Sequence, residues 1–393
     1  MIEAVPQPRR LFIIAILAGS ALRILQTATS LGSFDALLWY RWVELIDRVG
    51  ILRSYLYSEY MNHPPLALLV AQVTNRIGAA LGLGFSDSFR YLQCAADVVA
   101  TIFLLRIARR IGVKDPLEHA LMFFLSPAVI FISAFHCNSD PLMMMFVVVA
   151  VAMVLEERPA AGGIALAAGI GIKILPLLVA PLLLLACRGR AARLRFGGAA
   201  AAGLIVIFVP GLVVSGPTFL RDIFGYKGMP TGWGFRIVGE HVRQLTGWNG
   251  IGVLWRYASL LTVIAVAVLW LFAWKRSRAA GEAEASRLPA LVATTYLVVL
   301  FLAPGFGVQY LFWPLPFLAF AVERRLALLL HGLASIFTFA LYTSWVHGWP
   351  WWYAAGNPTR ADLQMVSAIG IVLWLAMGTG GVAALSRLIR TKR

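Results

Sequence analysis

Apolar runs long enough to cross a bilayer recur along the chain from Leu11 to Leu385, and short polar loops separate most of them. Three longer polar and aromatic segments interrupt the series. A hydrocarbon core of about 30 Å requires about 20 apolar residues in a helix. The pattern therefore predicts an all-α polytopic membrane protein in which residues 1–393 form one integral-membrane domain.

The composition supports this prediction. Hydrophobic residues make up 60% of the 393 residues, charged residues make up 13%, and the mean hydropathy is +0.80. These values lie outside the ordinary range of soluble domains, so most of the chain is expected to face lipid. The first run follows Arg9 and Arg10 and has no clear small-residue cleavage site, which favours a retained first helix over a signal peptide.

The formal net charge of +16 is better explained by membrane topology than by nucleic-acid binding. No basic stripe is interleaved with aromatic residues on a soluble domain, so no nucleic-acid partner is expected. Seven loop clusters contain 21 of the 34 Lys and Arg residues, and such loops stay cytoplasmic. The clusters are Arg9/Arg10, Arg106 to Lys114, Arg158, Arg188 to Arg195, Lys275 to Arg287, Arg324/Arg325 and Arg387 to Arg393.

The chain must cross the membrane an even number of times between cytoplasmic clusters, which predicts twelve spans with both termini cytoplasmic. The predicted spans are 11–28, 88–108, 117–135, 140–155, 160–173, 175–187, 197–215, 253–274, 289–304, 308–322, 326–344 and 363–385. Counting the apolar run 66–81 as a further span would place the basic cluster around Arg106 outside. We therefore expect it to form an external juxtamembrane helix that begins at His63-Pro64-Pro65.

The two predicted spans between Pro159 and Cys187 are short. About 13 residues of helix reach only ~20 Å, so the pair is expected to form a shallow hairpin whose tip lies near Lys173. A lysine below the membrane surface is costly unless an anionic group meets it. The alternative is that Lys173 extends to the outer interface and binds nothing.

The three longer polar segments, 30–63, 216–252 and 345–362, are expected to lie outside. Four tryptophans crowd the last one, where they form either an interfacial belt or a surface on which a sugar stacks. They are Trp345, Trp349, Trp351 and Trp352. We find no internal repeat of the kind that marks many transporters.

The first outer segment contains a candidate catalytic acid. Ser33 is a suitable N-cap for a helix on which Asp35, Trp39 and Trp42 share one face, while Arg41 lies on the opposite face. An aspartate in this position either interacts with the helix dipole or takes part in chemistry. Both interpretations remain open at this point.

Two further groups of polar residues lie at or within the predicted spans. His136 and Asp140 flank the end of the third span and can come close, but Asp140 before a proline also suits a helix cap. Two such side chains do not make a metal site. Asp97 lies within the second span on the same face as Arg90, so we expect it to pair with Arg90 or to pack against another helix.

The order of these motifs resembles that of a known superfamily. In chain order they are Asp35 after the first span, His63-Pro64-Pro65-Leu66, Arg90 with Asp97, Asn138-Ser139-Asp140, Gly171-Ile172-Lys173-Ile174-Leu175-Pro176 and Gln309-Tyr310-Leu311-Phe312-Trp313-Pro314. From about residue 11 to about residue 320 the chain resembles the GT-C superfamily of polyprenyl-phosphate-sugar glycosyltransferases. It is similar in pattern to the bacterial polyprenol-phosphate-mannose mannosyltransferases and to the glycosylphosphatidylinositol mannosyltransferases.

The resemblance implies a GT-C-like bundle of about twelve transmembrane helices with external juxtamembrane helices. It places the catalytic carboxylate in the first outer loop, which makes Asp35 the general base. The chain departs from the commonest pattern because Ala36 and Leu37, rather than a second acid or polar residue, follow Asp35. Lys173 and then Arg236 are the candidates to bind the donor phosphate. The other candidate substrate-binding residues are His63, His136, Asn138, Asp140, Gln309 and Tyr310.

The implied reaction is inverting transfer of a hexose, mannose-like, from a polyprenyl-phosphate sugar to a lipid-linked or cell-envelope glycan acceptor. It would occur at the outer face of a bacterial plasma membrane, with a glycan or glycolipid acceptor and membrane lipid as partners. No cofactor or metal is expected beyond the lipid-phosphate donor. The alternatives are a polytopic transporter or lipid scramblase without transferase activity, and a membrane transferase, such as a polymer ligase or acyltransferase, with a different lipid donor.

Overall fold

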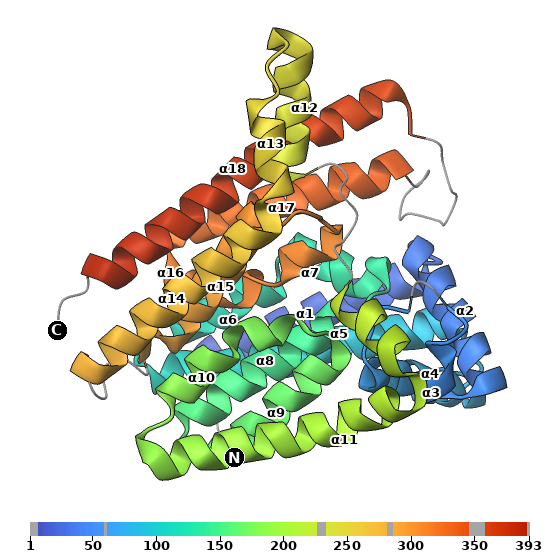
Figure 1. The fold of residues 1–393 in the computed structure, drawn as a ribbon, viewed down its shortest axis with the longest axis horizontal. Helices are drawn as coiled ribbons and strands as arrows, with labels where there is room; N and C mark the ends of the chain where they lie inside the picture. Colours follow the sequence, from blue (N-terminus) through green and yellow to red (C-terminus); the bar gives the residue numbers. More distant parts are fainter. Residues whose placement is uncertain (1–6, 59–60, 226–232, 281–285, 346–357, 391–393) are drawn as a thin grey trace.

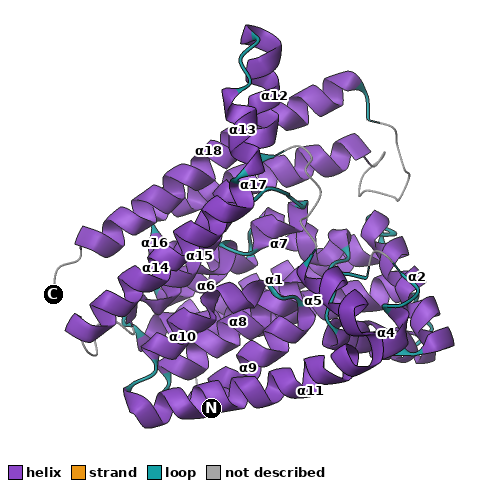
Figure 2. Ribbon diagram, viewed as in Figure 1, coloured by secondary structure: helices purple, strands orange, loops and turns teal. Residues whose placement is uncertain are grey.

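The protein is a bundle of helices. The computed structural model describes residues 7–58, 61–225, 233–280, 286–345 and 358–390. These residues form helices and connecting loops, and no strand occurs among them (Figure 2). The prediction of an all-α polytopic membrane protein is confirmed. Of the four tryptophans in the last outer segment, Trp349, Trp351 and Trp352 lie outside the described residues, and the side chain of Trp345 is not described.

The helices follow the predicted spans closely. The first half of the chain contains α1 (Gln7–Ala28), α2 (Phe34–Val49), α3 (Ile51–Ser54), α4 (Pro65–Ala80), α5 (Phe85–Arg110), α6 (Pro116–Phe124), α7 (Pro127–Phe131), the π-helix η1 (Ile132–His136), α8 (Asp140–Leu155), α9 (Pro159–Ile172), the 3₁₀ helix η2 (Leu175–Val179) and α10 (Ala180–Ala186). The second half contains α11 (Gly189–Phe224), α12 (Gly234–Thr246), α13 (Gly250–Arg256), α14 (Ala258–Ala280), α15 (Leu288–Leu302), η4 (Val308–Phe312), η5 (Leu315–Phe317), α16 (Leu318–Ala321), α17 (Arg324–Trp345) and α18 (Arg360–Arg390).

Six helices in the described part of the chain are long and apolar enough to cross a membrane. The bent pair formed by α6 and α7 with η1 adds a seventh candidate, and five shorter apolar helical segments accompany them. Together these segments coincide with the twelve predicted spans. The shorter ones suit the inside of the bundle, and α8, for example, is buried along most of its length.

Four predicted spans are less regular than expected, and prolines lie at the breaks in three of them. The span 175–187 divides into η2 and α10, each with a proline in its first turn. The span 117–135 bends by 45° at Ser126-Pro127, and the span 308–322 is a series of 3₁₀ turns around Pro314 and Pro316. A proline provides no backbone N–H for the preceding turn, so a continuous α-helix does not form there. The span 253–274 instead begins with the separate helix α13.

The first outer segment folds against one end of the bundle (Figure 1, blue). There α2, α3 and α4 pack on one another, and α11 reaches them through a kink at Gly216. The Ser215 hydroxyl donates a hydrogen bond of 2.5 Å to the Leu52 carbonyl, and the Phe219 ring meets Tyr55 edge-on at 5.0 Å. The prediction of a separate helix over 66–81 is confirmed by α4, which buries Leu68 and exposes its opposite face.

A close backbone contact joins α9 to α11. Gly163 of α9 lies so near α11 that a Cβ atom at this position would clash with the Phe196 carbonyl oxygen. Small residues allow helices in a membrane to approach and gain dispersion contacts. The predicted break near Lys173 is confirmed, since its backbone is extended between α9 and η2. The shallow depth of the hairpin in the membrane stays a prediction.

The buried acid Asp97 pairs with a different arginine from the one expected. Its Oδ2 accepts a hydrogen bond of 2.8 Å from Arg23 of α1, and both side chains are almost fully buried. Of the two alternatives expected for Asp97, pairing with Arg90 is wrong, because seven residues of helix separate the two side chains by about 10 Å. The other, packing against another helix, is confirmed by the contact with α1. Arg90 instead contacts Asp87, one turn away, and the Ser30 carbonyl.

The topology prediction can be tested with single cysteines, because the native residues Cys94, Cys137 and Cys187 are all buried. We expect an impermeant maleimide added to intact cells to label cysteines at the exposed positions Arg41 and Arg236. Cysteines at Lys275 and Arg325 should react only after the cells are opened, since basic loops stay cytoplasmic. The reverse labelling pattern would invert the topology.

Candidate functional site

A turn at the end of the α7–η1 segment is the centre of the candidate site. The chain leaves η1 through Cys137, a buried non-glycine residue with a left-handed backbone (φ 62°, ψ 50°). Such a conformation is uncommon for cysteine, and π-turns frequently occur at functional sites. The turn places His136 on one side of Cys137 and Asn138 on the other. Both side chains lie near the start of α2.

The start of α2 is fastened to this turn by Ser33. Its backbone N–H donates to the Phe135 carbonyl at 3.1 Å, and its hydroxyl donates to the His136 carbonyl at 2.5 Å. The same hydroxyl oxygen accepts a hydrogen bond from the Asp35 backbone N–H, so the predicted N-cap is confirmed. Gly32, with φ +84°, lets the preceding chain pass close to the Phe135 carbonyl.

Asp35 therefore lies directly beside the turn. Its Oδ2 accepts a hydrogen bond of 2.6 Å from the Asn138 side chain and lies 3.3 Å from His136 Nε2. The other Asn138 side-chain atom, Oδ1, accepts from the Ser139 backbone N–H at 2.7 Å, which fixes the amide so that its NH₂ group faces Asp35. The carboxylate keeps 26% of its side-chain surface exposed. Asp35 is held in place while it remains open to a substrate.

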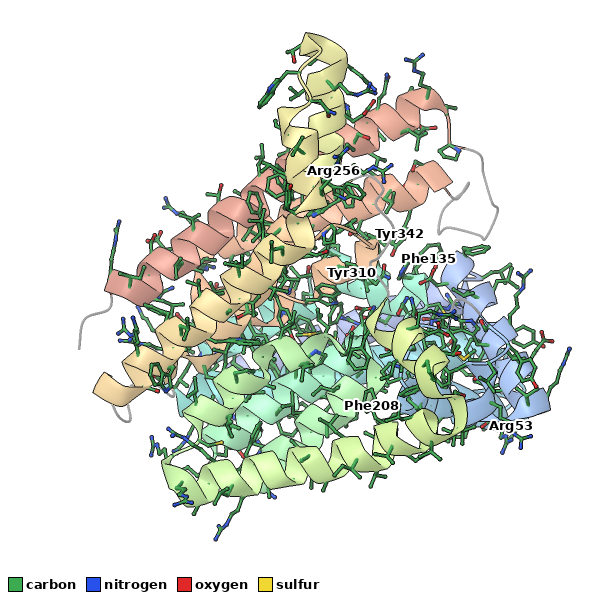
Figure 3. The ribbon with its side chains drawn as sticks, viewed as in Figure 1. Arg53, Phe135, Phe208, Arg256, Tyr310 and Tyr342 are labelled. Carbon is green, nitrogen blue, oxygen red and sulfur yellow. The ribbon has the colours of Figure 1, made fainter. Side chains whose placement is uncertain are left out.

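Gln309 reaches the same cluster from the other half of the chain. His136 Nε2 lies 3.0 Å from Gln309 Oε1. Because two side-chain oxygens face Nε2, this nitrogen carries the proton and donates it. The opposite ring nitrogen, Nδ1, is buried and makes no hydrogen bond within the described part of the chain. Tyr310, which follows Gln309, lies in the same region as Phe135 and Tyr342 (Figure 3).

Lys173 and Asp140 form a second, adjacent cluster. The ammonium contacts both carboxylate oxygens, at 3.1 and 2.9 Å, and the Trp313 indole N–H donates to Asp140 Oδ1 at 2.6 Å. Asp140 is fully buried, whereas Lys173 retains 14% of its side-chain surface. The ammonium also lies 5.1 Å from the Tyr310 ring centre. The anionic group that meets Lys173 in the structure is the Asp140 carboxylate. Contact of Lys173 with a donor phosphate stays a prediction.

His63 completes one wall of the site. Its ring lies edge-on to Trp39 at 4.6 Å and close to Trp42 at 5.4 Å. Both ring nitrogens are buried without a geometrically aligned hydrogen-bond partner among the described residues. The tryptophans are the aromatic face predicted for α2, and both are buried rather than open to a sugar.

The electrostatics of the site favour an ionised Asp35. Burial alone would raise the pKa of Asp35, but His136, Asn138 and Lys173 outweigh burial and hold the pKa below its ordinary value of 3.8. Burial, with the nearby Lys173 charge, lowers the pKa of His63 to about 3, so this ring is neutral near pH 7. The site thus holds a carboxylate ready to accept a proton beside a neutral imidazole.

Most of the predicted site residues meet here, and Arg236 does not. Arg236 is exposed on α12, where its guanidinium lies 5.4 Å from the Trp255 ring centre, and no contact to the cluster is found within the described ranges. Asp140 is the first residue of α8, but its side chain makes no cap hydrogen bond and pairs with Lys173 instead. No contact between His136 and Asp140 is found in this part of the structure, because His136 faces Asp35.

Sequence reasoning assigned no role to Trp313, although its indole binds Asp140. Its place four residues after Gln309 was the available signal, since the two occupy one short helical region. Within the described ranges, no group of three or more His, Cys, Asp or Glu side chains is arranged to hold a metal ion. The expectation of no metal or cofactor stays a prediction.

The sequence profile of glycosyltransferase family 87 matches residues 60–303, which is more than half of the chain. The chain belongs to glycosyltransferase family 87. This is a GT-C-type family, so the predicted superfamily is confirmed. The matched range contains His63, His136, Asn138, Asp140 and Lys173, whereas the predicted resemblance ran from about residue 11 to about residue 320. Three predicted site residues lie outside the match, namely Asp35, Gln309 and Tyr310. The contacts described above connect them to residues of the matched range.

Among solved structures, the chain is similar to the archaeal oligosaccharyltransferase AglB from Archaeoglobus fulgidus, solved with an inhibitory peptide and a dolichol-phosphate. The TM-score is 0.46 and the sequence identity is 12%. The similarity covers 95% of this chain and 55% of that one, so the chain spans about half the length of AglB. A search of the curated proteins gives no match.

The hydrogen bond from Asn138 to Asp35 should affect the pH dependence of turnover. Asn138→Ala removes a contact that lowers the pKa of Asp35, so this pKa should rise. Activity that needs the carboxylate is lost as pH falls through its pKa, so the acid limb of the turnover profile should move to higher pH in the variant. Asn249→Ala, at an exposed position before α13, is the control and should leave the limb unchanged. A limb unaltered in Asn138→Ala would contradict the assignment.

Proposed function

We infer that this family 87 protein transfers a hexose, mannose-like, from a polyprenyl-phosphate sugar to a lipid-linked or cell-envelope glycan acceptor, with inversion at the anomeric carbon. The observation that carries the proposal is the ionised, partly exposed Asp35 carboxylate, oriented by His136 and Asn138 beside the Lys173 ammonium. Family membership supports a glycosyltransferase rather than a transporter, a lipid scramblase or an acyltransferase.

In the proposed reaction, Asp35 is the general base. Its Oδ2 atom is engaged by Asn138 and lies near His136, whereas no hydrogen bond to Oδ1 is found among the described residues. Oδ1 therefore accepts the proton from the acceptor hydroxyl as that oxygen bonds to the anomeric carbon. The bond from the anomeric carbon to the phosphate oxygen breaks at the same time, and the polyprenyl phosphate leaves as an anion. No second carboxylic acid is needed to protonate such a leaving group, unlike in glycoside hydrolysis.

The leaving phosphate requires positive charge, and Lys173 is the best-placed cation. Its ammonium is near enough to contribute to the electrostatics of both Asp35 and His63. Asp140 already neutralises part of its charge, so the donor phosphate must share the ammonium with this carboxylate. We therefore expect Lys173 to contribute at the lower end of the ~1.5–3 kcal/mol range of hydrogen bonds to charged groups. Arg236 is distant from the cluster. It stays a second proposed phosphate contact, which requires the α12 region to approach a bound donor.

The remaining contacts suit the sugar. We expect Gln309 and Tyr310 to hydrogen-bond hydroxyl groups of the donor, and the buried His63 and His136 ring nitrogens offer further polar atoms at the same wall. The site is proposed to lie at the outer face of a bacterial plasma membrane with both termini cytoplasmic, as the basic loops predict. The identity of the hexose follows only from the resemblance to mannosyltransferases.

The decisive experiment is transfer from a synthetic polyprenyl-phosphate mannose by the purified protein. Asp35→Asn should abolish transfer and leave donor binding nearly intact, because the amide has almost the same shape but cannot accept the proton. Asp47→Asn is the matched control, since Asp47 lies on the same helix, is 43% exposed and makes only peripheral contacts to Gln72 and Arg76. Normal turnover by a folded Asp35→Asn variant would refute the base assignment. Equal use of a nucleotide-linked mannose would refute the donor class.

The role of Lys173 is best tested in a background where Asp140 carries no charge. Lys173→Ala alone would leave a buried carboxylate unpaired, which typically costs 3–5 kcal/mol of stability. Asp140→Asn should instead retain donor affinity, because it releases the ammonium for the phosphate. Adding Lys173→Ala to Asp140→Asn should weaken donor binding about tenfold and lower turnover at saturating donor. Equal donor titrations for the single and double variants would remove Lys173 from the phosphate site.

A further inference from the structure

A separate groove lies at the other end of the bent α6–α7 segment. It has a volume of about 680 Å³ and is bounded by α1, α6, α7 and α17. This volume is within the range of ~300–1,000 Å³ typical of small-molecule sites. Its walls are mainly apolar, with Leu121, Leu125 and Leu328 among them. None of its lining residues belongs to the Asp35 or Lys173 clusters.

Two buried polar atoms inside the groove lack partners in the described part of the structure. One is the hydroxyl of Ser126, at the break between α6 and α7, and the other is Nδ1 of His331 on α17. The other ring nitrogen of His331 binds the Leu315 carbonyl, so Nδ1 is a hydrogen-bond acceptor. Ser126 and His331 are only 4% and 5% exposed. Buried polar atoms are normally hydrogen-bonded, and leaving one unpaired is unfavourable. The neighbouring Ser335 is satisfied, because it binds the Ala128 N–H and the His331 carbonyl.

The mouth of the groove has both signs of charge. Arg324 forms an ion pair with Glu118, and both residues line the groove. The Arg324 side chain is 70% exposed, and the Glu118 side chain is 34% exposed. The pair begins α17 and α6, so it lies where these helices leave the membrane. His331 follows Arg324 by seven residues, or about 10 Å of helix, so the unpaired groups lie below the charged mouth.

We propose that this groove binds a diacyl phospholipid with a phosphate and a primary ammonium in its head group, such as phosphatidylethanolamine. The phosphate meets Arg324 and the ammonium meets Glu118, so each member of the ion pair gains an opposite charge. An ester carbonyl, between head group and chains, accepts a hydrogen bond from the Ser126 hydroxyl. One acyl chain fills the leucine-lined part of the groove.

The same contacts argue against the other lipids. An isoprenoid phosphate has no ester carbonyl for Ser126 and no ammonium for Glu118. A phosphatidylglycerol head lacks the ammonium, and the quaternary ammonium of phosphatidylcholine has no N–H to donate to a carboxylate. The site is thus distinct in chemistry, as well as in place, from the proposed donor site.

Gly332 provides a specific way to block the groove. A Cβ atom added there meets no atom within 4 Å, and the residue lines the groove on α17. Gly332→Leu should therefore fill the groove without a clash and with improved helix propensity. Gly198→Leu on α11 is the matched control, because an added Cβ meets no atom there either and Gly198 lines a different groove, beside Arg190 and Arg193.

Native mass spectrometry of the detergent-purified full chain, titrated with phosphatidylethanolamine, phosphatidylglycerol or phosphatidylcholine, provides the test. We expect phosphatidylethanolamine to bind tightest, and Gly332→Leu to weaken it about tenfold while Gly198→Leu does not. Glu118→Gln should remove the preference for phosphatidylethanolamine. Unchanged binding in Gly332→Leu, equal binding of all three lipids to the wild type, or displacement by a polyprenyl phosphate would each overturn the proposal. The readout is independent of sugar transfer.

Discussion

A charge that leaves water for the interior of a membrane protein must meet an opposite charge, and two buried ion pairs satisfy this constraint here. Arg23 and Asp97 join α1 to α5, and Lys173 and Asp140 join the tip of the α9 hairpin to the start of α8. Neither pair is necessarily a large source of stability, because desolvation offsets much of the attraction. Each pair does fix which helices are neighbours. The second pair also sets the depth of Lys173 beside Asp35.

The sequence predicted the helical segments well because their signals are local. Hydrophobic length, basic loops and prolines identified the twelve apolar segments, the separate helix over 66–81 and the break at Lys173. Asp35 on an aromatic helix face with Ser33 as its cap was also predictable. Resemblance supplied its catalytic role, which sequence spacing alone left open.

The partners of these residues were not predictable, because they come from segments distant in the chain. By sequence alone, Asp97 could pair with any of several arginines. Only the packing of the helices brings Arg23 to it. The contact between His136 and Gln309 joins residues 173 positions apart. Arg236 seemed suitable from its charge and predicted outer position, but on α12 it packs on Trp255, and no contact to the cluster is found within the described ranges. Charge and span number thus indicate the side of a residue, not its neighbours.

The missing side chain at Gly163 has a consequence for the rate of an enzyme built on this fold. Gly163 lies ten residues before Lys173 on α9, about 15 Å along the helix, and it sets how closely α9 rests on α11. A larger residue at Gly163 would displace the axis of α9, and with it the Lys173 ammonium. Every group that contacts substrate would remain chemically unchanged. Small residues buried between helices can therefore set the distance between a charged group and the groups with which it interacts. Substitutions at such a contact between helices can change the reaction rate, although the residues of the contact never touch the sugar.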